Sequence, residues 1–162
     1  MNLKVIDENN FIITIIDKKL IPKLDENSIS NYLKKILLKI KTKYQINIYG
    51  YYDVFIYVDE YYGIIIKLIR EELEYLSYYD KEIEMKIIVL DNQFFYEIED
   101  IYKIKQEILD ISDIYLYNNQ IYLELKSDIN FTLYGYLIEN SKVIYEDTEK
   151  IKKEGNKIEI GW

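Results

Sequence analysis

The chain of 162 residues contains no cysteine and no histidine. Without cysteine it has no disulfide framework, no thiolate metal site and no thiol nucleophile. Without histidine it lacks the commonest general base near neutral pH, so serine–histidine and cysteine–histidine nucleophile systems are excluded within this chain. Zinc sites built on imidazole or thiolate are excluded for the same reason. Carboxylate chemistry is what remains.

Glycine is scarce, and its five positions, 50, 63, 135, 155 and 161, lie far apart. They form no phosphate loop and no dinucleotide-binding fingerprint, both of which need closely spaced glycines. Adjacent Asp-Glu pairs occur at 7–8, 25–26 and 59–60, as chance predicts among 29 acidic residues, and none lies in a loop of the calcium-binding type. We expect no enzymatic activity, no cofactor and no metal site, although a carboxylate-dependent enzyme stays open as a third interpretation.

Alanine is also absent, and there is one arginine, Arg70, and one proline, Pro22. Isoleucine, lysine, asparagine and tyrosine are abundant instead. This bias is typical of an AT-rich genome, because these residues have AT-rich codons. The 19 tyrosines are therefore not evidence of function by their number alone.

The length favours a single α+β domain over residues 1–162, with a split near residue 100 as the alternative. The amino terminus meets charged residues at once and shows no signal-peptide pattern. The longest uncharged runs have about nine residues, too few to cross a bilayer. We therefore expect a soluble, cytoplasmic protein that does not insert into a membrane.

The segment Tyr44–Asp100 contains five runs rich in β-branched and aromatic residues, separated by Asp, Gly, Asn or charged breaks. Such runs predict strands. They begin near residues 44, 53, 62, 82 and 93, and we expect them to form one mostly antiparallel sheet on which the rest of the chain packs.

Two amphipathic helices are predicted beside this sheet. The first spans about 28–43, capped by Asn27 or Ser28, with an apolar stripe and a lysine-rich outer face; the second spans about 100–111. Hairpins are predicted at 3–16, at 113–126 around Asn118-Asn119, and at 131–145. A short helix stopped by Gly155 is predicted over residues 147–154, and a last strand is predicted over residues 157–160. A helix, strands and a Tyr-Gly pair occur twice, so an internal duplication stays open.

Charge is unevenly distributed along the chain. Residues 1–58 carry a net charge of +3, residues 59–100 a net charge of −8 and residues 101–162 a net charge of −3. The net charge of the central segment alone therefore equals that of the whole chain, −8. With this acidic balance and a single arginine, direct binding of nucleic acid is disfavoured. The lysine face of the first helix is expected to be a solvated surface, with contact to an anion or nucleic acid as the alternative.

The densest acidic part, residues 70–84, interleaves acids with tyrosines. It is either a solvated loop or a face that docks a basic protein surface, because acids steer basic partners and tyrosines supply rigid contact area. The candidate partner-binding residues are Glu71, Glu72, Glu74, Tyr75, Tyr78, Tyr79, Asp80 and Glu82.

These features together favour a non-enzymatic binding protein that blocks a basic, nucleic-acid-acting partner protein. Immunity proteins that neutralise a toxin and phage-encoded blockers of host defence nucleases have this profile of size and charge, which is an analogy and not a motif match. The alternative is an adaptor or structural module of a bacterial assembly, including a homo-oligomer built through exposed strand edges.

Overall fold

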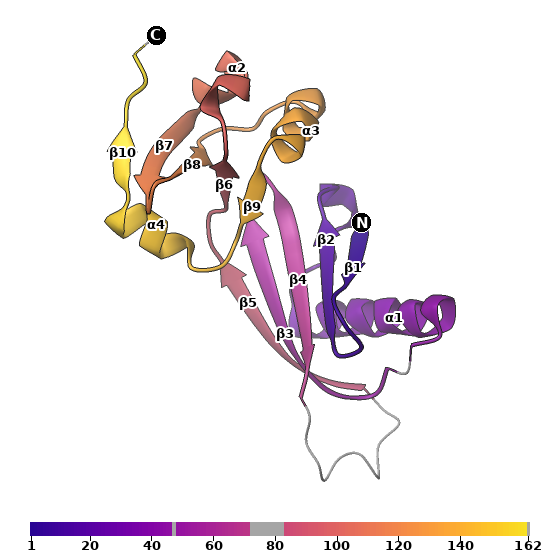
Figure 1. Ribbon diagram of the computed structural model, residues 1–162. Coiled ribbons are helices and arrows are strands. Elements are labelled where there is room, and N and C mark those ends of the chain that lie inside the picture. Colours follow the sequence, from indigo (N-terminus) through magenta and orange to yellow (C-terminus); the bar gives the residue numbers. More distant parts are fainter. Residues whose placement is uncertain (47, 72–82, 162) are drawn as a thin grey trace. The chain divides into compact units, whose positions relative to one another are not determined.

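The computed structural model describes residues 1–46, 48–71 and 83–161, and the chain divides into two compact units. The first unit comprises Met1–Val58 and Gly63–Asp91, and the second comprises Asp59–Tyr62 and Asn92–Trp162. Each contains a five-stranded sheet with helices, as Figure 1 shows. The predicted α+β class with mostly antiparallel strands is confirmed, whereas the single domain and its alternative stay predictions.

The first unit is built on a sheet with the strand order β1-β2-β4-β3-β5. Its strands are β1 (Asn2–Val5), β2 (Asn10–Ile15), β3 (Gly50–Asp59), β4 (Gly63–Arg70) and β5 (Ile83–Asp91). The β1–β2 and β2–β4 pairs are antiparallel, but β3 and β5 are parallel over nine residue pairs. This parallel pair is an exception to the mostly antiparallel sheet expected for the central runs, and it forms because β5 lies on the side of β3 away from β4.

Two local features hold the hairpin strands in register. In the β1–β2 loop the Asp7 carboxylate accepts hydrogen bonds from the N–H groups of Asn9 and Asn10, at 2.7 and 2.9 Å. Gly63 begins β4 with a φ of +116°, and a Cβ there would come within 2.3 Å of the Ile15 carbonyl oxygen. Only glycine fits this position without strain. A single 3₁₀ turn, η1 (Lys18–Leu20), follows β2.

The helix α1 (Glu26–Tyr44) is longer than predicted at both ends. Asp25 caps it by accepting the N–H of Ser28, so the expected cap at Asn27 or Ser28 was wrong by a few residues. Gln45 ends it in the left-handed conformation, with a φ of 54°. The strand predicted to begin at residue 44 is therefore wrong, because the helix runs through that residue and the strand starts only at Gly50.

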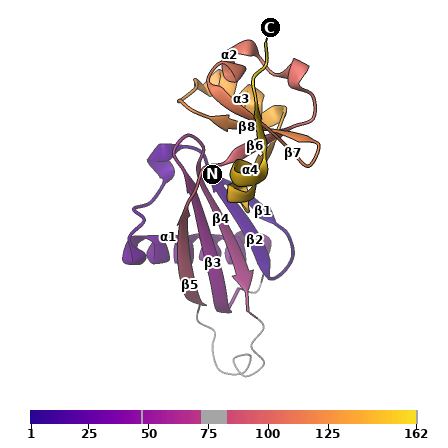
Figure 2. The same ribbon diagram turned by 90° about the vertical axis from the view of Figure 1, so that its left-hand side faces the viewer.

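One face of the first sheet is covered by α1, as Figure 2 shows. The predicted lysine-rich face is exposed as expected, and within the described residues no helix combines the length and apolar character needed to span a membrane. The core joins the alternate residues of β2, β3 and β4 to the apolar stripe of α1, namely Ile29, Leu33, Ile36, Leu37 and Ile40.

The second unit is built on an antiparallel sheet with the order β10-β7-β8-β6-β9. Its strands are β6 (Phe95–Ile98), β7 (Ser112–Tyr117), β8 (Gln120–Leu125), β9 (Lys142–Ile144) and β10 (Asn156–Ile158). The residues expected to belong to a single sheet with β3 and β4 are thus divided, because β6 pairs with β8 and β9 instead.

Three short helices and a 3₁₀ turn accompany this sheet: η2 (Ile101–Lys103), α2 (Gln106–Leu109), α3 (Phe131–Glu139) and α4 (Thr148–Glu154). The predicted β7–β8 hairpin is confirmed, with Asn118 and Asn119 at φ of 47° and 61°. The predicted helix stopped by Gly155 is also confirmed.

Two predictions in this unit were wrong. The helix expected over 100–111 is split into η2 and α2, and the strand expected over 131–138 is the helix α3. Asn130 caps α3 by accepting the N–H of Leu133 at 2.9 Å, and Tyr134 and Leu137 are its buried residues, at helical spacing. The Tyr-Gly pair at 134–135 lies inside this helix, whereas the pair at 62–63 leads into a strand, so the two pairs are not structurally equivalent.

We expect Ile36→Ala to lower the free energy of unfolding by about 2–5 kcal/mol, because Ile36 is 5% exposed and its truncation leaves a cavity under α1. Lys35→Ala, on the exposed face of the same helix, is the matched control and should change stability by less than about 0.5 kcal/mol. Urea unfolding followed by circular dichroism measures both. Equal effects of the two substitutions would contradict the assigned helix face.

Candidate functional site

Polar side chains gather on the face of the first sheet that points away from α1. Asp53 of β3 pairs in register with Lys86 of β5, and Tyr51 pairs with Glu84. Residues opposite each other on adjacent strands share a face. Glu71 follows β4, and its N–H donates to the Tyr51 carbonyl at 2.9 Å, which continues the pairing with β3. We call these five residues the acidic face.

Two carboxyl groups crowd together on the acidic face. A hydrogen bond between the side chains of Glu71 and Asp53, followed by the charge of Asp53, raises the pKa of Glu71 above its ordinary value of 4.5. The ammonium of Lys86 acts in the opposite direction and does not cancel the shift. The two carboxyl groups repel each other when both are ionised. Because Glu71 is exposed, a partner could reach this pair.

The single arginine does not neutralise this crowding. The guanidinium of Arg70 lies over the ring of Tyr49, 4.3 Å from its centroid, and donates to the Asn9 side chain at 3.4 Å. Successive residues of a strand point to opposite faces, so Arg70 and Glu71 diverge. On the acidic face the carboxyl-bearing residues are Asp53, Glu71 and Glu84, and Lys86 is in register with Asp53.

Of the eight candidate partner-binding residues, the structure describes Glu71, which is exposed as expected for a docking residue. The other seven lie outside the described residues, so their role stays a prediction: Glu72, Glu74, Tyr75, Tyr78, Tyr79, Asp80 and Glu82. The described ends of this segment, Glu71 and Ile83, belong to the first unit, and Glu84 follows directly on β5.

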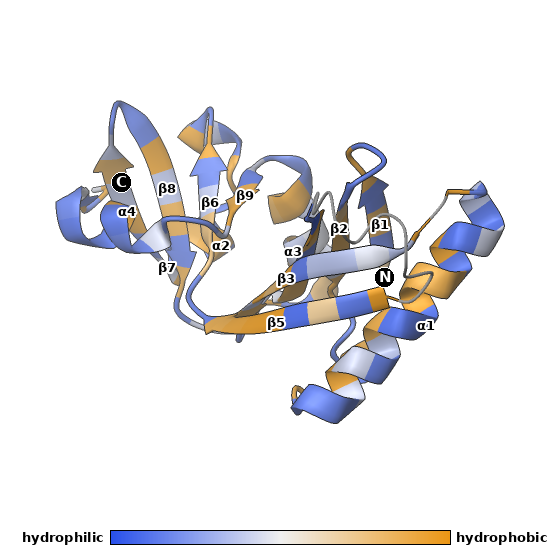
Figure 3. Cartoon of the chain, turned by 90° about the horizontal axis from the view of Figure 1, so that it is seen from below, coloured by the Kyte–Doolittle hydropathy of each residue, from blue (hydrophilic) through white to orange (hydrophobic). Residues whose placement is uncertain are grey.

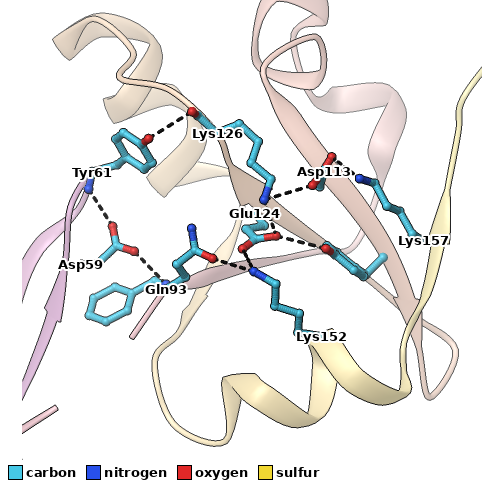
Figure 4. A network of polar contacts seen from close by, with 10 residues as sticks. Asp59, Tyr61, Gln93, Asp113, Glu124, Lys126, Lys152 and Lys157 are labelled. Carbon is cyan, nitrogen blue, oxygen red and sulfur yellow. Dashed lines mark hydrogen bonds and ion pairs between the residues drawn. The ribbon is translucent and has the colours of Figure 1, made fainter. Parts of the chain in front are cut away.

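The second unit contains a network of ion pairs, shown in Figure 4. Glu124 of β8 is 1% exposed, and its carboxylate lies 3.0 Å from the Lys126 ammonium and 2.8 Å from that of Lys152 on α4. Asp113, opposite Glu124 on β7, lies 3.0 Å from Lys126 and 2.8 Å from Lys157 on β10. Two acids that face each other would repel, and Lys126 bridges them.

This network is suited to structure and not to proton transfer. Burial acts to raise the pKa of Glu124, but the hydrogen bonds and charges of Lys152 and Lys126 outweigh it, so the pKa is lowered. The Tyr115 hydroxyl donates to the same carboxylate at 3.1 Å. A carboxylate with a lowered pKa and both oxygens engaged is a poor general base. It ties α4 and β8 together instead.

A second buried carboxylate, that of Asp59, organises an aromatic cluster. It accepts the N–H groups of Tyr61 and Tyr62 at 2.9 and 2.7 Å, and that of Phe94 at 2.8 Å. The Tyr62 ring contacts Phe94 and Tyr134, with centroids 5.1 and 6.0 Å apart. This cluster accounts for several tyrosines by packing alone.

Two hollows of this unit are lined by charged residues. One, of about 340 Å³, is lined by Glu97, Glu99, Asp100 and Glu139, with Lys103 and Lys142 among them. The other, of about 320 Å³, includes Asp113 and Lys157 of the ion-pair network. Among residues 1–46, 48–71 and 83–161, no three acidic side chains approach closely enough to hold a metal ion. The absence of enzymatic activity stays a prediction.

Comparisons with protein-family models, with curated proteins and with solved structures found no match.

Sequence reasoning missed Asp53, the described residue that meets Glu71. The two are 18 positions apart and come together because β4 lies beside β3 in the sheet. The alternation of β3, in which Tyr52 and Val54 are buried, would have placed Asp53 on the opposite face. The strand pairing itself could not be deduced from that pattern.

The contribution of the buried Glu124 carboxylate to stability can be tested by substitution. We expect Glu124→Gln to lower the free energy of unfolding by about 1–3 kcal/mol, because it weakens the ion pairs to two lysines and the Tyr115 hydrogen bond. Glu149→Gln breaks the exposed pair with Lys153, at 3.1 Å, and should cost less than about 1 kcal/mol. Chemical unfolding at neutral pH compares them.

The contribution of Glu124 to stability should depend on pH. The folded-state pKa of Glu124 is lowered, so its stabilising effect is present above the ordinary value of 4.5 and is lost as the pH falls through the folded-state pKa. The difference in stability between the wild-type protein and Glu124→Gln should shrink in acid. A difference that stays constant down to the acid limit of folding would contradict the ion pairing.

Asp53→Asn should lower the pKa of Glu71, because it removes the neighbouring charge that opposes ionisation of that carboxyl. Carbon-detected NMR titration of the Glu71 carboxyl measures this. Glu84→Gln is the control, since Glu84 does not contribute to the shift, and should leave the Glu71 pKa in place. An unchanged pKa in Asp53→Asn would show that the two acids do not interact.

Proposed function

We propose that this chain is a non-enzymatic binding protein that blocks a basic partner protein, of the class that acts on nucleic acids. The partner docks on the acidic face together with the adjoining segment of residues 72–82. The observation that supports this most is the crowding of the Asp53 carboxyl against that of the exposed Glu71, whose raised pKa the ammonium of Lys86 does not offset.

Crowded like charges disfavour the free protein, and a cation from a partner relieves them. A lysine or arginine placed between Asp53 and Glu71 would lower the raised pKa of Glu71 and release its proton. Binding should therefore strengthen as the pH rises through the Glu71 pKa. The neighbouring acids Glu72, Glu74, Asp80 and Glu82 extend the negative potential and accelerate association with a basic surface.

The tyrosines of the segment contribute differently from its acids. Tyr75, Tyr78 and Tyr79 supply rigid apolar area, which acts at close range and therefore on the dissociation rate. Seven tyrosines elsewhere in the chain are already buried in its core. Those of this segment are proposed as contact residues because they alternate with acids, not because tyrosine is common.

The alternative, an adaptor or structural module of a bacterial assembly, is favoured by the edge strand β5. Nine residues long, it pairs with β3, and no other strand of the described residues pairs with it. An adaptor would join several partners or copies and need not show the salt dependence of an acidic docking face. The salt dependence of binding therefore distinguishes the two proposed functions.

The proposed function is tested by two charge variants used as bait in pull-downs from the native host, with quantitative mass spectrometry. The first variant combines Glu71→Lys, Glu72→Lys and Glu74→Lys. The second combines Glu107→Lys, Glu149→Lys and Glu159→Lys, which makes the same charge change at exposed positions of the second unit. We expect the first to lose a basic partner that the wild-type protein and the second variant retain.

Kinetics with that purified partner complete the test. The first variant should associate more slowly and with a weaker salt dependence, because screening at about 0.1 M salt acts over about 10 Å and mainly affects steering. Tyr78→Ala should shorten the lifetime of the complex with little change in association. If both charge variants bind with wild-type kinetics while folded, the acidic segment is a solvated loop and the proposal fails.

A further inference from the structure

The strand β5 differs from the other edge strands of the two sheets. The edges β1, β9 and β10 have four, three and three residues, whereas β5 has nine. Proteins commonly protect sheet edges by keeping edge strands short or charged, because unpaired backbone groups recruit further strands. β5 carries three charged residues, but it is long for an edge strand, and a long edge strand is suited to pairing with another strand.

The side chains of β5 are mostly apolar, as the orange bands along it in Figure 3 show. Val89 and Leu90 are 43% and 38% exposed, and Glu84, Lys86 and Asp91 are its charged residues. Among the described residues, β3 is the strand that pairs with it, so its outer backbone groups face away from the sheet. We propose that β5 pairs antiparallel with β5 of a second copy of this chain, centred on Met85.

The backbone restricts the registers that such a dimer can adopt. In β5, alternate residues direct their N–H and C=O groups toward β3, and the residues between them direct these groups outward. For the two copies to form hydrogen bonds, residues whose N–H and C=O groups point outward in one copy must lie opposite such residues in the other. In an antiparallel pair with two-fold symmetry, some residue must therefore lie opposite its own copy.

Charge selects one register from this set. When Met85 meets its own copy, Glu84 lies opposite Lys86 of the second copy, twice by symmetry, and Ile83 lies opposite Ile87. When the centre is Glu84 or Lys86, like charges meet. When it is Ile87, Lys86 faces Ile88 and Glu84 faces Leu90. Over residues 83–87, the register centred on Met85 pairs Glu84 with Lys86 and apolar residues with apolar residues, whereas Asp91 lies outside this pairing.

This pairing joins the two first sheets into one of ten strands, with both copies of α1 on the same side. Within β5 the pairing spans residues 83–87 of each copy and uses Glu84 and Lys86 of the acidic face, and it needs no partner protein. The purified chain alone is sufficient to test it.

The first experiment uses two opposite charge substitutions, Glu84→Lys and Lys86→Glu. Each variant alone places two like-charge pairs across the two-fold axis, whereas an equimolar mixture of the two variants restores opposite charges at both positions. In light scattering over a concentration series, we expect twice the chain mass of 19.7 kDa for the wild-type protein and for the mixture, and a dimer weakened at least tenfold for each variant. A variant that failed to fold could not be rescued by mixing.

The second experiment exploits the absence of cysteine, which makes single-cysteine crosslinking unambiguous. Met85→Cys places two thiols opposite each other, within the Cα separation of 4.4–6.8 Å, roughly, that a disulfide requires. Ile87→Cys places them about 13 Å apart in this register, from four residue steps along the strands. We expect a covalent dimer after mild oxidation of Met85→Cys and not of Ile87→Cys.

Three results would overturn the proposal. A wild-type protein that stays monomeric at every concentration would show that β5 does not pair with its own copy and is free for a partner's strand. A wild-type dimer that is not restored in the mixture, or one that crosslinks through Ile87→Cys and not Met85→Cys, would exclude the register centred on Met85.

Discussion

The packing of α1 against one face of the first sheet is the constraint on which the proposed activities depend. Isoleucine and leucine side chains from the helix and from alternate positions of β2, β3 and β4 fill the space between them. The alternation of the strands then forces the intervening residues onto the opposite face, where Asp53, Glu71 and Glu84 gather. The hydrophobic core thus positions the acids, although it contains none of them.

The elements with strong local signals could be predicted from the sequence. The apolar stripe of α1, the Asn118-Asn119 hairpin and the helix before Gly155 follow from side-chain spacing and turn chemistry, and all are present. The prediction over 131–138 failed because a short aromatic run fits either a strand or a helix, and the cap at Asn130 decided for the helix. The parallel β3–β5 pair and the division into two sheets depend on contacts distant in sequence, which no local pattern contains.

The candidate site was predictable only in part, for a related reason. Charge density along the chain identified the acidic segment and its first residue, Glu71. The neighbour that makes Glu71 unusual, Asp53, could be found only from the strand order. In the second unit, a buried ion-pair network around Glu124 and packing around Asp59 account for some of the acids and tyrosines. Composition alone could not separate these structural uses from a binding face.

We propose that a basic partner docks on the acidic face of the first unit, with the segment that follows it. Hydrogen–deuterium exchange of the chain, free and bound to the partner recovered with it, measures this most directly, because a docked surface exchanges more slowly. Docking on the acidic face should slow exchange within residues 50–54 and 71–86 and leave exchange around the Glu124 network unchanged. Protection confined to residues 92–162, with none in those two ranges, would contradict it.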